Sequence, residues 1–266
     1  SSDVCSSDLS LKRLFLDAIK GKARIIEYVA LQDVSFTVEK GEVVAILGRN
    51  GAGKSSLIKA LVGLVEPHSG DISVDGINLS KMKQAERSQR IGYIPQEPGD
   101  LLYLTSVREE CARADKDNHL PYGTSVGLLH SMLPSISLES HPRDLSEGER
   151  LTLVLALVLS GSPEILILDE PTRGLDYSAK NRLMALLHTR ARELDTAILI
   201  ATHDVEIVAE VADRTIFLAD GEKVADGTTL DVLLASPAFA PQVAKVMSPR
   251  RWLTVSDVLR SQELAE

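Results

Sequence analysis

Short apolar runs alternate with segments of helical periodicity along most of the chain. Runs that are apolar except for Glu42, at 42–47, 165–168 and 197–201, are typical of strands buried on both faces of a parallel sheet. Apolar positions spaced three and four apart predict helices between and beside these strands. The helices are expected at 54–65, 147–160 and 178–194. This alternation predicts an α/β fold in which right-handed crossovers connect parallel strands.

Weaker patterns predict the smaller elements. Apolar and polar residues alternate at 34–38, which predicts a strand with one buried face, and 91–94 is a further short strand. Asp-Gly turn signals predict a short strand with a turn over 71–78 and a hairpin of 215–218 with 223–226. Helical spacing also occurs at 11–22, 229–235 and 255–264.

The segment 97–145 lacks any convincing strand. Proline and glycine divide it into short pieces, of which 105–114 and 124–133 have helical spacing. With the apolar helix that follows, we expect a small helical lobe at about 97–160, inserted into the α/β core. The other expected divisions are a tail or linker at 1–22, with a disordered, foreign or truncated start, a main domain at 23–236 and a helical extension at 237–266.

Composition narrows the function. The 266 residues are 44% apolar, enough for a substantial core, and the net charge of −9 argues against a nucleic-acid partner. The two cysteines do not form a disulfide framework. We see no secretory signal and no run near the ~20 apolar residues of a membrane span, so a cytoplasmic protein that reaches a membrane through partners is expected.

The first chemical motif follows the apolar run 42–47. Gly48, Gly53, Lys54 and Ser55 fit G-x-x-x-x-G-K-[ST], in which backbone N–H groups and a helix start surround a phosphate. We expect Lys54 to reach the β- and γ-phosphates and Ser55 to ligate Mg²⁺. The alternative is an ordinary glycine-rich turn. The expected nucleotide contacts are Gly48, Asn50, Gly51, Ala52, Gly53, Lys54, Ser55 and Ser56.

The second motif is a pair of carboxylates at the end of the apolar run 165–168. Consecutive strand residues point to opposite faces, so Asp169 and Glu170 can have different roles. We expect Asp169 to hold Mg²⁺ and Glu170 to polarise a water for attack on the γ-phosphate. A charged turn without chemistry is the alternative for an isolated pair of this kind.

The segment 145–150, Leu-Ser-Glu-Gly-Glu-Arg, combines a serine cap and a glycine at a helix start. It resembles the L-S-G-G-Q-R signature of ATP-binding-cassette (ABC) ATPases. The family's other motifs follow in order, and the resemblance covers about 28–235. They are Gln96 of the Q-loop, Asp169 and Glu170 of Walker B, 174–176 of the D-loop with Asp176, and the switch residue His203.

The resemblance implies a P-loop NTPase with ABC architecture: a mixed sheet with RecA-like parallel strands, an antiparallel β subdomain and an inserted helical lobe. It also implies that ATP and Mg²⁺ bind between two ATPase domains, as a homo- or heterodimer. Ser146 and Gly148 of one domain then face the phosphate loop of the other. By the same resemblance, His203 contacts the γ-phosphate, Gln96 senses Mg²⁺ and Asp176 belongs to the nucleotide site.

Two features depart from the family pattern. Glu147 and Glu149 replace a glycine and a glutamine of the signature, and the added acid at Glu147 either weakens the composite site or points away. The residue that stacks on adenine is open between Tyr28, which lies close to the first strand, and Arg24, whose guanidinium plane can stack. Each could instead have only a packing or solvated role.

The phrases at 94–98, 144–148, 171–176 and 211–214 resemble ATPases of import systems, most closely the energy-coupling-factor (ECF) type. The resemblance implies uptake of a vitamin or metal ion, an integral-membrane coupling subunit and a location on the cytoplasmic face of the membrane. The start of the cassette is equally similar to ATPases of polysaccharide or lipid exporters. A soluble ribosome-associated ABC ATPase is a further alternative, although such proteins normally carry tandem cassettes.

Overall fold

The computed structural model describes residues 30–235 and 239–263. The helix expected at 11–22 and the adenine candidates Arg24 and Tyr28 lie outside the described residues. No helix within the described ranges is both long and apolar enough to cross a membrane.

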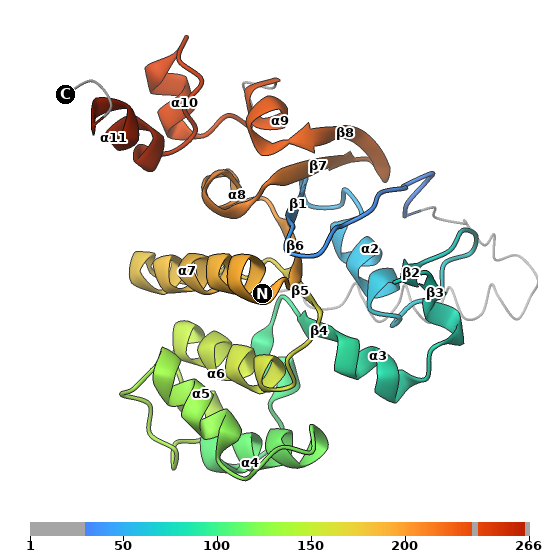
Figure 1. Ribbon diagram of the computed structural model, residues 1–266, viewed down its shortest axis with the longest axis vertical. Coiled ribbons are helices and arrows are strands. Elements are labelled where there is room, and N and C mark those ends of the chain that lie inside the picture. The colour runs from blue at the N-terminus through green and yellow to red at the C-terminus, as the bar shows by residue number, and fades with distance from the viewer. Residues whose placement is uncertain (1–29, 236–238, 264–266) are drawn as a thin grey trace, which may run out of the picture.

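A six-stranded sheet forms the centre of the fold, in the order β4-β5-β6-β1-β7-β8 (Figure 1). Its first five strands run parallel, and β8 pairs antiparallel with β7. The strands are β1 (Val43–Leu47), β4 (Ile91–Ile94), β5 (Ile165–Asp169), β6 (Ala197–Thr202), β7 (Arg214–Ala219) and β8 (Glu222–Thr228). The α/β fold with a mixed, mostly parallel sheet is thereby confirmed.

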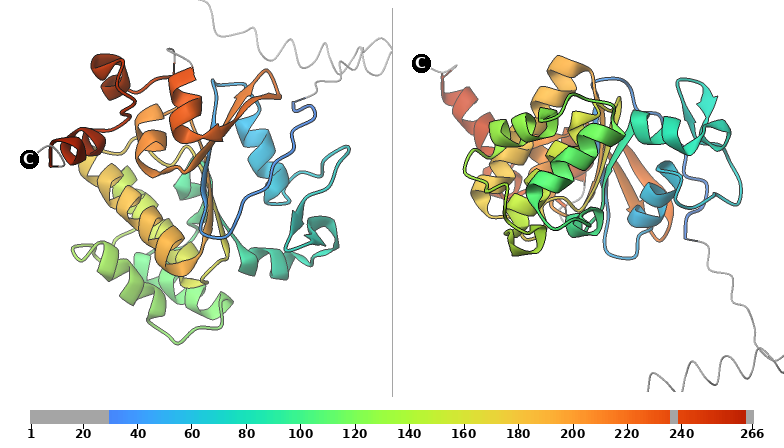
Figure 2. Two further views of the ribbon diagram at one scale, coloured as in Figure 1. Left: turned by 45° about the horizontal axis from the view of Figure 1, so that its top comes forward. Right: turned by 90° about the horizontal axis from the view of Figure 1, so that it is seen from below.

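Alternate residues of β1 divide the core into two layers. Val43 and Leu47 belong to a cluster with α6 (Glu147–Ser160), α7 (Tyr177–Leu194) and α8 (Val205–Val211). Val44 and Ile46 face the opposite side, in a cluster with α2 (Lys54–Leu61). Figure 2 shows α2 and α7 on opposite sides of the sheet. Because both faces are covered, all five residues of β1 are buried.

The chain between β4 and β5 is helical, as the sequence predicts. The helices α4 (Val107–Asp117) and α5 (Thr124–Met132) pack on α6 around a separate apolar cluster that contains Cys111, Leu129 and Leu153. Short 3₁₀ turns lie at Pro98–Leu101 and Pro142–Asp144. In Figure 1, the helices α4, α5 and α6 lie below the β4 edge of the sheet.

The remaining elements are small. They are the strand pair β2 (Ser73–Val74) and β3 (Ile77–Asn78), the 3₁₀ turn Leu79–Lys81, and the helices α3 (Gln84–Arg90), α9 (Thr229–Ala235), α10 (Gln242–Met247) and α11 (Val255–Glu263). The predicted hairpin after β7 is confirmed by the β7–β8 pairing.

The strand predicted at 34–38 is wrong. Val34, Phe36 and Val38 do pack against the α2-side cluster, so the alternation reports burial correctly. The backbone carbonyls are instead bound by side chains: Lys223 Nζ donates to Ser35 O at 2.6 Å, and an Arg214 guanidinium N–H donates to Thr37 O at 3.0 Å. An alternating pattern thus identifies which side chains are buried, but it does not determine which groups form hydrogen bonds with the backbone.

The helix predicted at 54–65 is shorter than expected. It ends at Leu61 because Gly63, with φ of 73°, turns the chain into the left-handed region. The amide of Leu64 then donates back to Lys59 O at 2.8 Å, which closes the helix end.

Candidate nucleotide-binding site

The glycines of the phosphate loop are required by close backbone contacts. The loop joins β1 to α2, and a Cβ on Gly48 would lie 2.5 Å from the carbonyl oxygen of Leu218. Gly53 has a φ of 99° at the start of α2, and a Cβ there would lie 2.7 Å from Ala30 O. Any larger residue at either position would push the loop away from β7 or from the segment before β1.

Lys54 lies inside this loop and is only 6% exposed. Its ammonium group donates to Gly48 O at 2.8 Å and to Arg49 O at 3.3 Å, and it lies 3.4 Å from Oε1 of Glu170. These acceptors fix the cation at the mouth of the loop, where an entering phosphate would meet it.

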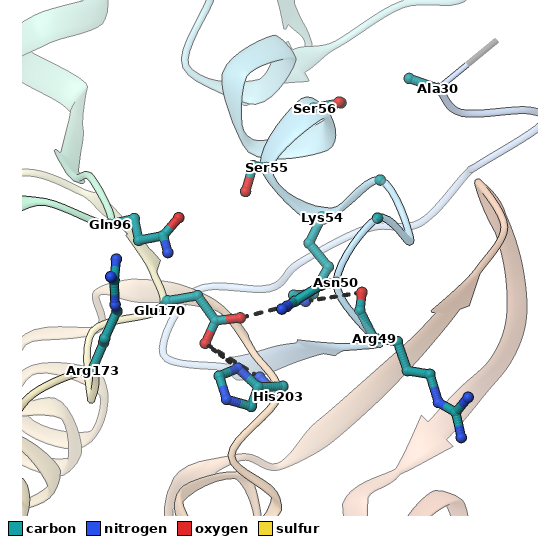
Figure 3. Close-up of a pocket in the computed structure, with 12 residues that line it drawn as sticks. Ala30, Arg49, Asn50, Lys54, Ser55, Ser56, Gln96, Glu170, Arg173 and His203 are labelled. Carbon is teal, nitrogen blue, oxygen red and sulfur yellow. Dashed lines mark hydrogen bonds and ion pairs between the residues drawn. The ribbon is translucent and has the colours of Figure 1, made fainter. Parts of the chain in front are cut away.

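Glu170 connects the ends of two neighbouring strands. It follows β5 with a φ of 49°, a strained conformation for a residue with a side chain. Its Oε2 accepts a hydrogen bond from the Thr202 hydroxyl at 3.1 Å and lies 2.8 Å from Nδ1 of His203 (Figure 3). The parallel β5–β6 pairing thus brings the predicted base and the switch histidine together.

Asp169 is 3% exposed, and its Oδ1 is the one buried side-chain polar atom in the described ranges without a hydrogen-bond partner. Burial raises the pKa of Asp169, the hydroxyl of Ser55 counteracts the rise, and the charge of Glu170 adds to it. An unsatisfied carboxylate oxygen near a hydroxyl has the chemistry that Mg²⁺ prefers. The residues therefore fit this ion, held through few protein oxygens.

The fit is to Mg²⁺ bound together with a nucleotide. No group of three or more His, Cys, Asp or Glu side chains that could hold a metal occurs in the part of the chain that the structure describes. Mg²⁺ usually keeps several waters and takes further oxygens from substrate phosphates. Gln96 lines the same cavity as Ser55, and Figure 3 shows the amide group of Gln96 extending toward Ser55.

These residues surround a cavity of about 680 Å³. Nine predicted residues line it: Asn50, Gly51, Gly53, Lys54, Ser55, Ser56, Gln96, Glu170 and His203. The predicted residues Gly48, Ala52 and Asp169 do not line it, and all three are buried. The lining also includes Ala30, Arg49 and Arg173, which the sequence analysis missed. Only their position could have identified the two arginines, because Arg49 lies inside the phosphate-loop motif and Arg173 lies shortly after Glu170.

The signature and the D-loop lie outside this cavity. Ser146 accepts a hydrogen bond from the Glu149 amide and caps α6, and Gly148 lies against Ala179 of α7. Asp176 caps α7 by accepting from the Ala179 amide at 2.7 Å. Within one chain, none of Ser146, Gly148 and Asp176 is brought to the phosphate loop.

Both departures from the signature are bound within the first turn of α6. Oε1 of Glu147 pairs with Arg150 at 2.8 Å. Oε2 of Glu149 accepts from the Ser146 amide at 2.9 Å and from its hydroxyl at 2.8 Å, and these bonds lower the pKa of Glu149. Ser146 and Glu149 thus form a reciprocal capping box.

A phosphate loop after the central strand and a buried Asp-Glu pair on a nearby strand define a P-loop nucleotide-binding domain. The family model "ABC transporter" matches residues 31–173. A putative ABC transporter ATP-binding protein of Streptomyces coelicolor is 54% identical over 229 residues, which are 86% of this chain and 40% of that protein. The chain belongs to the ABC transporter family, as an ABC ATPase domain.

Two further relatives are similar over most of their own length. The energy-coupling factor transporter ATP-binding protein EcfA of Methanothermobacter thermautotrophicus is 35% identical over 209 residues, 76% of this chain and 67% of that protein. The structure of cbiO1 from Clostridium perfringens, described as part of the ABC transporter complex cbiONQ, has a TM-score of 0.70 and 31% identity and covers 83% of this chain and 90% of its own.

The chain spans about two fifths of the length of the Streptomyces coelicolor protein and of a second relative from Streptomyces avermitilis, which is 52% identical.

Proposed function

We propose that this chain binds and hydrolyses ATP to drive a membrane transporter. The observation that supports this most is the cavity in which Lys54, Glu170 and His203 converge. A cation, a candidate base and an orienting imidazole are the groups that γ-phosphate hydrolysis requires. The family match to residues 31–173 is consistent with this chemistry.

Each residue has a defined part in this proposal. Lys54 binds the β- and γ-phosphates, with backbone N–H groups of the loop. Glu170 accepts a proton from the attacking water at its carboxylate, and His203 holds Glu170 and the γ-phosphate in register. Mg²⁺, when bound, supplies positive charge beside the phosphates, and Ser55, Gln96 and Asp169 are the residues that would hold it.

We infer that the active unit contains two ATPase domains. Ser146 and Gly148 lie outside the phosphate-loop cavity, so they can act on a nucleotide only in another domain. A second copy of this chain or a different ATPase domain would supply the missing side. In a closed sandwich the two helix starts would face the γ-phosphate in a site that excludes water.

The transporter class proposed is an ECF-type importer. Similarity to EcfA over 67% of its length and to cbiO1 supports this class over an exporter. The chain would then lie on the cytoplasmic face of the membrane, bound to an integral-membrane coupling subunit. No nucleic-acid partner is proposed, in keeping with the net charge of −9.

The variant Glu170→Gln tests the hydrolytic role. We expect ATP hydrolysis to fall by about 10²–10³, as when one transition-state contact is removed, while ATP still binds. Phosphate release and nucleotide binding are measured on the same preparation. Glu193→Gln, which alters an exposed glutamate of α7 outside the cavity, is the matched control and should hydrolyse normally. Undiminished hydrolysis by Glu170→Gln would remove this residue as the base.

A further inference from the structure

Arg173 is a cation of the nucleotide cavity that the proposed mechanism does not use. It follows the Walker B segment, and its backbone amide donates to Glu170 O at 3.2 Å. Arg173 lines the cavity together with Gln96, and Figure 3 shows its side chain extending toward the Gln96 end. Arg49 extends away from this side chain in the same view.

The partner of Arg173 lies outside the cavity. A guanidinium N–H of Arg173 donates to Oε1 of Glu97 at 2.5 Å, and Glu97 does not line the cavity. Both side chains are more than half exposed, at 58% and 57%. An exposed ion pair of this kind contributes little to folding, so it can exchange partners easily.

The ammonium group of Lys54 is held more firmly than the guanidinium group of Arg173. Lys54 has two carbonyl oxygens and a carboxylate within 3.4 Å and is buried. His203 lies against Glu170. A phosphate offers the same planar pair of oxygens to a guanidinium as a carboxylate does, with more charge. Arg173 thus has an exchangeable partner and extends toward the Gln96 end of the cavity, whereas Lys54 is fixed and Arg49 extends away.

We propose that Arg173 binds the terminal phosphate of the nucleotide and that Glu97 pairs with this arginine until the nucleotide enters. The proposal rests on the nucleotide site described above and adds a ligand to it. When a nucleotide with a γ-phosphate enters, Arg173 exchanges the Glu97 carboxylate for phosphate oxygens. A diphosphate lacks the terminal phosphate, so the pair remains closed when a diphosphate binds.

The exchange has a consequence for the segment after Gln96. Glu97 directly precedes the 3₁₀ turn Pro98–Leu101, whose other side lies on α6: a Cβ on Gly99 would lie 3.3 Å from Cδ of Arg150. Arg150 in turn donates to Leu145 O at 2.9 Å and pairs with Glu147. Release of Glu97 frees one attachment of this turn and leaves the attachment to the signature helix in place.

Nucleotide binding by the full chain tests the proposal. Titrations with Mg²⁺ and either a nonhydrolysable ATP analogue or ADP are compared for wild type and Arg173→Gln. We expect the variant to bind the analogue about 10- to 100-fold more weakly, as for lost hydrogen bonds to a charged group, and to bind ADP normally. Equal weakening for both nucleotides, or none for the analogue, would overturn the proposal.

A second variant tests whether Glu97 competes with the nucleotide for Arg173. Glu97→Gln removes the competing carboxylate, so the analogue should bind about 1.5- to 5-fold more tightly, the equivalent of one exposed ion pair. In the double variant this gain should vanish, because Glu97 acts through Arg173. If Glu97→Gln weakens binding as Arg173→Gln does, the pair only supports the cavity wall and the proposal fails.

The matched control is Arg108→Gln. Arg108 pairs with Glu139 at 2.7 Å in another exposed ion pair, outside the cavity. Its loss should change neither titration. A wild-type chain that binds neither nucleotide would refute the proposed function itself, whereas binding that is insensitive to Arg173 would refute only this inference.

Hydrogen exchange gives an independent readout of the exchange of partners. Binding of the analogue to wild type should raise amide exchange at residues 97–101, while ADP should not. In Arg173→Gln the same amides should exchange faster before any nucleotide is added. Unchanged exchange in both cases would overturn the release of Glu97.

Discussion

Asp169 combines a functional position with an unfavourable environment. Its carboxylate is buried, one oxygen lacks a hydrogen-bond partner, and burial raises its pKa. A raised pKa in the folded state means that the contribution of Asp169 to stability is most favourable below the ordinary pKa of aspartate. That contribution is lost as the pH rises through the raised value, so the ionised group opposes folding at neutral pH.

Replacement by the neutral Asp169→Asn should therefore stabilise the chain when nucleotide and Mg²⁺ are left out. A gain of about 1 kcal/mol corresponds to a rise in Tm of about 2–4 °C for a chain of this size. The same variant should hydrolyse ATP poorly at any Mg²⁺ concentration. A thermal melt at pH 7 measures the first effect, and a lower Tm than wild type would contradict the argument.

At the scale of elements, one carboxylate both caps α8 and pairs with α7. Asp204 caps α8 by accepting from the Glu206 and Ile207 amides, and it pairs with Lys180 of α7 at 2.7 Å. Burial opposes its ionisation, but Lys180 and the two amides outweigh this and lower the pKa of Asp204. Its stabilising effect is present above the ordinary pKa of aspartate and is lost as the pH falls through the lowered value.

Asp204→Ala should lower the free energy of unfolding at pH 7 by about 1–2 kcal/mol, the sum of a cap and a partly exposed ion pair. Asp204→Asn keeps a capping side chain and should lose less. Urea unfolding over a series of falling pH values measures both, and the difference between wild type and Asp204→Ala should narrow toward acid pH. A difference that is constant over this range would show that charge is not involved.

The elements that sequence predicts best are those whose pattern matches their burial. The strand at 197–201 and the helix at 147–160 are apolar enough to be recognised without knowledge of their neighbours, and both are observed. The helix α3, Gln-Ala-Glu-Arg-Ser-Gln-Arg, has no buried residue, so no periodicity could indicate it. The prediction of a strand at 34–38 is wrong because side chains of β7 and β8 bind the carbonyl groups of this segment.

The residues of the candidate site also differ in how well the local sequence predicts them. Lys54 and Ser55 belong to a contiguous motif, and their local backbone fixes their place. Arg173 depends on Glu97, which lies 76 positions away in the sequence. A pair of this kind follows from the packing of separate segments, and nothing in either local sequence predicts it.

At the scale of the whole molecule, the signature and the phosphate loop lie apart on one chain. Nucleotide should therefore promote association with a second ATPase domain. We expect the Glu170→Gln chain to associate when ATP is added, because ATP is bound and consumed slowly. Light scattering after gel filtration measures the mass. Lys54→Ala, which removes the phosphate-binding cation, should remain unassociated, and association that is independent of ATP would contradict the sandwich.

The position of β1 within the sheet has a dynamic consequence. The phosphate loop extends from this fully buried strand, which has three strands on one side and two on the other, whereas Gln96 follows β4 at the edge. Local opening begins where fewest contacts must break, so the β4 edge opens before the centre. The molecule can therefore loosen around Gln96 and Glu97 while the phosphate loop stays in place.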